Sequence, residues 1–188
     1  MRDRVAAAIV GALADDAALA ALRDLVQTGS WAPDEVALTI RRLEAGVTAA
    51  EACRREVPST VPPLDRALGE AAVLFRVGLY FEVHEVLEAI WLELADPERS
   101  AVQGLIQIAV ALHHLAHANP RGAVSLFAAG REKLAPHRPT FMGVEVSALL
   151  ADLVGWEAAA AGGAWPTDPS VPPLVVSFSS ARARPPCA

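Results

Sequence analysis

A histidine and a glutamate stand four residues apart in the stretch YFEVHEVLEAIW, which covers residues 80–91. In an α-helix this spacing places the side chains of His84 and Glu88 one turn apart on the same face. An imidazole nitrogen and a carboxylate oxygen held in this way could chelate a divalent transition metal such as Zn, Fe, Mn or Ni. The same two groups could instead share a hydrogen bond inside the protein without any ion. The spacing alone leaves both possibilities open.

The residues around this pair predict that it points into the protein. Aromatic and leucine side chains fall within about 60° of His84 on a helical wheel, where each residue advances by 100°. Glu88 lies in the middle of this apolar face and Glu85 lies at its edge, whereas Glu82 falls on the opposite side, where we expect water. A buried carboxylate needs a partner, because desolvating an unpaired charge costs several kcal/mol.

A second apolar segment, at about residues 97–118, offers partners in the form of a polar stripe: Gln103, Gln107 and His114. These three side chains fall within about 40° of one another on the helical wheel. The rest of this helix is apolar nearly all round, which is typical of a central, buried helix. We therefore predict that the polar stripe faces His84 and Glu88.

Two main hypotheses follow for the pair. In the first, His84, Glu88 and His114 bind a divalent transition metal, with Glu85 or His113 as the next candidate ligands and water completing the coordination shell. In the second, the pair and the polar stripe are only a buried hydrogen-bond network, which fixes helix register in a non-enzymatic structural or interaction protein, such as a homodimer. Acid–base catalysis by the pair is a third, weaker hypothesis.

Recognised catalytic motifs do not settle the choice. The segment starting at His84 begins like the zinc-protease motif HExxH, but Glu88 stands where the second histidine is required. No nucleophile elbow, Walker loop or dinucleotide-binding glycine pattern occurs in the sequence. The residues therefore predict no reaction and no nucleotide cofactor. We expect Trp91 to be a core residue that supports the site.

Composition narrows the class of protein. The chain has 188 residues, of which 53% are hydrophobic, so it can bury a sizeable core. Its 16 basic against 22 acidic residues give a net charge of −6, which disfavours nucleic-acid binding. Its two cysteines form no disulfide or zinc-finger pattern, and its most apolar segment is too short and too polar to span a membrane. We expect a cytoplasmic protein without a membrane or nucleic-acid partner.

Helix signals dominate the chain and predict an all-α fold, a compact antiparallel helical bundle. Residues 1–60 form a smaller N-terminal helical region, with a cap at Asp15 or Asp16, a helix from Pro33 to Gly46, and a capping box at Thr48 that starts another helix. A proline-rich break precedes the bundle core, residues 64–165, and an irregular tail follows. The core helices are expected at about residues 65–77, 80–94, 97–118, 120–134 and 144–161, and the tail at 166–188, with a short strand near 174–178.

Four segments resemble the bacterial and archaeal domain-of-unknown-function family 309: YFEVHEVLEAIW, VQGLIQIAVALHHL, NPRGA and GVEVSALLADLV. The family's hallmark, H-x-x-x-E-x-x-W/Y, is met by His84, Glu88 and Trp91. The resemblance extends over about residues 65–165 and leaves residues 1–60 outside. It implies an all-helical fold and a suggested role in metal binding, and it implies no reaction.

Overall fold

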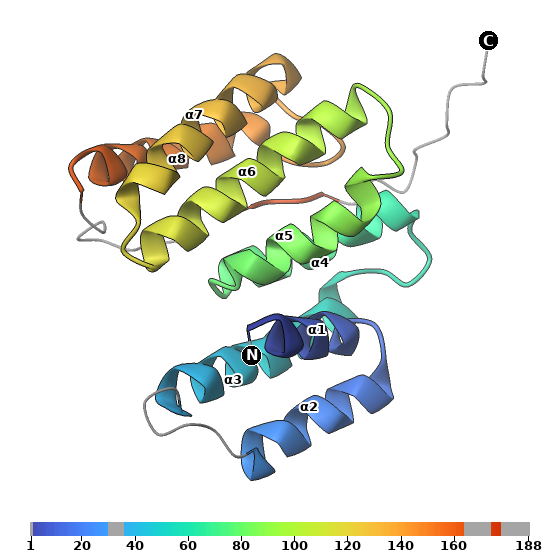
Figure 1. The fold of residues 1–188 in the computed structure, drawn as a ribbon. Coiled ribbons are helices and arrows are strands. Elements are labelled where there is room, and N and C mark those ends of the chain that lie inside the picture. Colours follow the sequence, from blue (N-terminus) through green and yellow to red (C-terminus); the bar gives the residue numbers. More distant parts are fainter. Residues whose placement is uncertain (1, 30–35, 164–173, 178–188) are drawn as a thin grey trace.

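The computed structural model describes residues 2–29, 36–163 and 174–177. Within these residues the chain forms eight α-helices and one short 3-10 helix, so the predicted all-α bundle is confirmed (Figure 1). None of the described helices is both long and apolar enough to cross a membrane. In chain order the elements are α1 Arg2–Ala12, α2 Asp16–Thr28, α3 Val36–Glu56, α4 Pro63–Arg76, α5 Tyr80–Trp91, α6 Glu98–Ala116, α7 Pro120–Leu134, η1 Ala135–His137 and α8 Val146–Ala161.

Short polar side chains start several helices where the sequence predicts them. The Asp15 side chain accepts the backbone N–H of Ala18, and Asn119 accepts that of Gly122 at 3.1 Å. Such caps satisfy backbone donors that a helix N-terminus leaves without a partner. The proline-rich break falls between α3 and α4, as predicted.

The N-terminal region differs from the prediction in one element. α3 runs without interruption through Gly46, and Thr48 donates its hydroxyl to the Glu44 carbonyl at 3.0 Å instead of capping a new helix. Gly46 is required for close packing, because a Cβ there would lie 2.6 Å from Cγ1 of Ile9 on α1. The predicted capping box was therefore wrong. The helix start expected at Pro33 lies outside the described residues.

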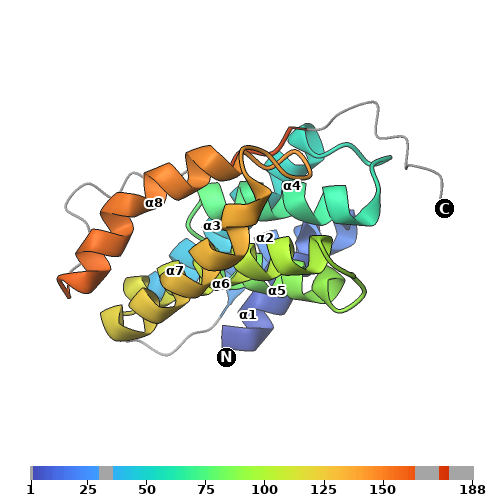
Figure 2. The same cartoon turned by 90° about the horizontal axis from the view of Figure 1, so that it is seen from above.

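The helices form layers that share one core. Seen from above, α5, α6 and α7 lie along one side of the molecule and α4 and α8 lie along the other (Figure 2). The N-terminal helices pack beside α5, at the bottom of Figure 1. A single cluster of buried apolar side chains extends from Val5 of α1 to Leu174. The boundary near residue 60 stays a prediction about separate folding units.

A short C-terminal segment closes the back of the bundle. Val176 forms an isolated antiparallel bridge with Val144, and Ser177 donates its backbone N–H to the Gly143 carbonyl at 2.8 Å. Leu174 is buried beneath it. The strand expected here is thus a single bridge within the described residues. The rest of the predicted tail lies in residues 164–173 and 178–188, which are outside the described part of the chain.

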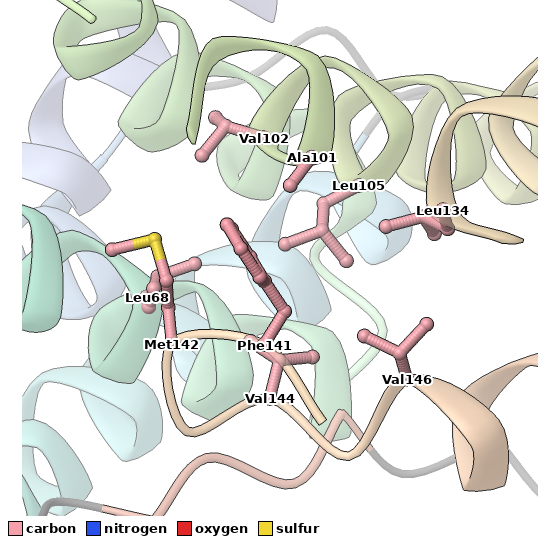
Figure 3. Close-up of a pocket in the computed structure, with 9 residues that line it drawn as sticks. All are labelled: Leu68, Ala101, Val102, Leu105, Leu134, Phe141, Met142, Val144 and Val146. Carbon is pink, nitrogen blue, oxygen red and sulfur yellow. The ribbon is translucent and has the colours of Figure 1, made fainter. Parts of the chain in front are cut away.

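A small cavity lies between the loop at residues 141–146 and helices α4, α6 and α7 (Figure 3). Its volume is about 10 Å³, which is close to the minimum that one water molecule needs. All its lining side chains are apolar, so it offers no group that could orient a substrate or bind an ion. They are Leu68, Ala101, Val102, Leu105, Leu134, Phe141, Met142, Val144 and Val146.

Candidate metal centre

Helix α5 carries the candidate site, and it contacts neighbouring helices on several sides. Val83 and Leu87 are almost fully buried in the core. Phe81 packs against His113 of α6, with the two ring centroids 5.5 Å apart. His84 follows Phe81 on the same side, with the two rings 5.9 Å apart. His84 therefore lies beside the contact between Phe81 of α5 and His113 of α6, at the seam between the two helices.

Three side chains of α5 converge at this seam and form the α5 cluster: His84, Glu85 and Glu88. Nδ1 of His84 lies 3.2 Å from Oε1 of Glu85, and Nε2 of His84 lies 3.4 Å from Oε2 of Glu88. One ligand atom from each residue can be chosen so that all three atoms lie within 4.8 Å of one another. The imidazole thus stands between two carboxylates that could bind the same ion.

The α5 cluster is less buried than the sequence predicts. The His84 side chain is 24% exposed, whereas those of Glu85 and Glu88 are 41% and 51% exposed. The prediction of a buried His–Glu pair was therefore wrong for Glu88. The buried face of α5 includes Val83, Val86 and Leu87, and the two glutamates lie on its more exposed side.

The polar stripe of α6 does not face the α5 cluster directly. α6 presents His113 to Phe81 on α5, whereas its opposite side presents Gly104 to α7, where a Cβ would lie 2.7 Å from Cγ of Leu134. On the helical wheel the stripe falls roughly midway between these two directions. It therefore borders the seam beside α5 and reaches toward α7.

Hydrogen bonds within the described chain do not join the polar stripe to the α5 cluster. Oε1 of Gln107 is buried without a hydrogen-bond partner. Nδ1 of His114 lies 3.0 Å from Nδ2 of Asn119, whose Oδ1 already accepts the N–H of Gly122. The Asn119 amide must therefore donate to His114, and neutral His114 carries its proton on Nε2. Of the three predicted ligands, the structure brings together His84 and Glu88, and the third residue of this group is Glu85 and not His114.

Glu82 lies on a side of α5 that the helical wheel predicted wrongly. It is 1% exposed, although we expected it in water. Its Oε1 accepts a hydrogen bond from Nε of Arg42 on α3 at 2.7 Å. The N-terminal helices cover this side of α5, and the pattern of α5 alone could not predict that cover.

Trp91 joins the end of α5 to the start of α6. Its Nε1 donates to the Arg99 carbonyl at 3.1 Å, and the Arg99 guanidinium lies 4.2 Å from the indole ring centroid. Arg99 in turn donates to the Leu94 carbonyl at 3.2 Å. Trp91 packs against the core as expected, and it also fixes the two helices next to Glu88.

Comparison with known proteins finds two similarities. An uncharacterized protein of Aquifex aeolicus (strain VF5) is 28% identical to this chain over 92 residues, which are 47% of the chain. The match spans 28% of the length of that relative. No solved structure matches the chain. Residues 68–126, from α4 into α7 and including the whole α5 cluster, match the family described as Domain of unknown function (DUF309). This segment is similar to that family, and the resemblance seen in the sequence is confirmed over residues 68–126.

Proposed function

We propose that the protein binds a divalent transition metal through His84, Glu85 and Glu88. The observation that carries this proposal is the convergence of three ligand atoms within 4.8 Å on a single helix. The proposed role is metal binding, and the proposal extends to no reaction.

The chemistry of the three side chains supports the proposal. One imidazole and two carboxylates suit borderline cations such as Zn, Fe, Mn or Ni, which accept mixed nitrogen and oxygen ligands. Two carboxylates beside the same ring repel one another, and a divalent cation between them would remove that repulsion. Because all three ligands come from one helix, water could occupy the remaining coordination positions on the exposed side.

The surroundings of His84 also favour a fixed ligand. The ring packs beside Phe81, which is itself held against His113 of α6. At the other end of α5, the Trp91–Arg99 contacts hold the last turn against α6. Restricting a ligand side chain before binding lowers the entropy that binding must remove.

One observation favours a structural alternative. If His84 is protonated, its two ring nitrogens could pair with Glu85 and Glu88 at the present distances of 3.2 and 3.4 Å, without an ion. The cluster would then be a surface ion-pair network, which contributes little stability. It would show no preference for a metal.

Metal titration distinguishes a metal site from an ion-pair network. Protein purified without a nickel column is titrated calorimetrically with Zn²⁺ and with Mn²⁺, beside the variants His84→Ala and Glu88→Gln. We expect one equivalent in the wild type and at least a roughly tenfold weaker affinity in each variant, as is typical when metal-site groups are lost.

Glu93→Gln is the matched control, because Glu93 is exposed and lies beyond the C-terminal end of α5. Circular dichroism verifies that each variant folds. The same affinity in wild type and all variants, or no binding in any of them, would leave the structural alternative.

A further inference from the structure

Two histidines at the C-terminal end of α6 form a second pair, the α6 pair, one turn apart: His113 and His117. Their ring centroids lie 4.1 Å apart with a tilt of 39°. His117 is exposed, whereas His113 is half-buried and packs against Phe81. The pair therefore lies at the surface, with one ring anchored against the bundle.

The protonation of His117 follows from its hydrogen bond. Its Nδ1 lies 2.8 Å from the backbone carbonyl oxygen of His113. A carbonyl can only accept, so Nδ1 carries the proton and Nε2 of the neutral ring keeps its lone pair. Metal-binding histidines commonly use this arrangement, in which one ring nitrogen donates to a carbonyl and the other binds the ion.

The neighbouring His114, when neutral, carries its proton on the other ring nitrogen, Nε2. Its Nδ1 accepts from the Asn119 amide, as the cap of α7 requires, and its ring centroid lies 6.4 Å from that of His113. Using Nδ1 of His114 as a ligand would break that hydrogen bond. The two ligands in this turn are therefore His113 and His117.

The distance between the rings is close to that in a chelate. With metal–nitrogen bonds of about 2.1 Å and the angle of about 90° of a tetragonal site, two imidazole centroids bound to one ion would be about 4.6 Å apart. The α6 pair would have to open by roughly 0.5 Å. The exposed His117 ring can make this movement without disturbing the core.

From these observations we infer that the α6 pair is a second metal site, which binds Cu²⁺ or Ni²⁺ through two imidazole nitrogens with water in the other positions. All-nitrogen protein ligands favour these late first-row ions, and affinity for them exceeds that for Mn²⁺. The α5 cluster supplies mainly oxygen and differs in this respect. Phe81 stands between the sites, since its ring contacts both His84 and His113.

The test uses the full chain with the α5 cluster disabled by His84→Gln and Glu88→Gln. Cu²⁺ is added and followed by calorimetry and by electron paramagnetic resonance, in which each bound imidazole adds nitrogen hyperfine structure. We expect one Cu²⁺ bound with a two-nitrogen signal. Adding His117→Ala should weaken the affinity at least roughly tenfold and leave a one-nitrogen signal.

His137→Ala in the same background is the control, because the His137 ring packs against Phe141 and belongs to neither site. Unchanged Cu²⁺ affinity after His117→Ala would overturn the inference, as would the absence of binding in the background protein. In the otherwise wild-type chain, His117→Ala should weaken the binding of one Cu²⁺ ion by a similar factor. Because the α5 cluster is disabled in the first experiment, its result does not depend on metal binding at His84.

Discussion

Nε of Arg42 on α3 donates to Oε1 of Glu82 on α5 at 2.7 Å, and Nη2 of Arg42 lies 2.6 Å from the same oxygen. The Glu82 side chain is 1% exposed and that of Arg42 is 21% exposed, so water screens this ion pair only weakly. The pair joins the N-terminal helices, which lie outside the matched family segment, to the helix that carries the α5 cluster.

Removing one partner of this pair should destabilise the whole protein. Arg42→Met leaves the buried Glu82 carboxylate without its guanidinium, and we expect the free energy of unfolding to fall by about 3 kcal/mol. Replacing both residues, with Arg42→Met and Glu82→Leu, removes the uncompensated charge and should recover most of that loss. Urea denaturation followed by circular dichroism measures both. A double variant as unstable as the single one would contradict this explanation.

Local signals in the sequence predicted much of the fold, because they act within a few residues. Asp15, Asn119 and the prolines between α3 and α4 start or end helices through hydrogen bonds and backbone geometry that depend only on nearby residues. The prediction that a helix ends at Gly46 was wrong because it, too, rested on a local signal. A glycine near the end of a helical pattern usually stops a helix, but here it allows α1 to approach α3.

The candidate site was harder to predict because it depends on neighbouring helices. The wheel correctly placed His84 and Glu88 on one side of α5, but it could not show that the N-terminal helices cover Glu82 and leave Glu88 half-exposed. His114 matched the polar stripe by periodicity, yet the cap of α7 uses its Nδ1. Burial on a helix with several neighbours depends on tertiary packing, which cannot be read from the periodicity of that helix alone.

The hydrogen bond donated by the Trp91 indole should contribute measurably to the stability of the protein. Trp91→Phe keeps an aromatic ring but removes the Nε1–H donor to the Arg99 carbonyl, which we expect to cost about 1 kcal/mol. Leu92→Ala is a suitable control, because Leu92 is 65% exposed and its truncation should change stability by no more than about 0.5 kcal/mol. Urea unfolding of both variants tests this, and equal stabilities would indicate that the hydrogen bond contributes nothing.

Gly104 and Gly155 should respond in opposite directions to the same change. A Cβ on Gly104 would lie 2.7 Å from Cγ of Leu134 and 3.1 Å from the Gly130 carbonyl oxygen, so Gly104→Ala should destabilise the α6–α7 contact by about 1–3 kcal/mol. Around Gly155 on α8 there is no described atom within 4 Å of the added Cβ. Gly155→Ala should therefore stabilise the helix by about 0.5–1 kcal/mol. Thermal unfolding of the two variants compares them directly, and a shift in the same direction would contradict the packing argument.

Cys53 should make the protein lose stability in alkaline solution. Burial raises the pKa of its thiol from 9.0 to about 12, whereas the thiol of the unfolded chain keeps its ordinary pKa. Below pH 9 the thiol is protonated in both states, so its contribution to stability is fully present. Between pH 9 and 12 the unfolded chain loses the proton first, and the free energy of unfolding should fall by up to about 1.4 kcal/mol per pH unit.

Comparison of Cys53→Ala with the parent isolates this effect, with Cys187→Ala in both proteins so that Cys53 is the only thiol of the parent. The free energy of unfolding is measured by urea denaturation at pH 8, 9.5 and 10.5. Loss of the side chain lowers stability at every pH, but the fall above pH 9 should be shallower in Cys53→Ala. Some fall remains above pH 10, because burial also raises the pKa of Tyr80 to about 12. Parallel curves for the two proteins would mean that the buried thiol does not carry the alkaline instability.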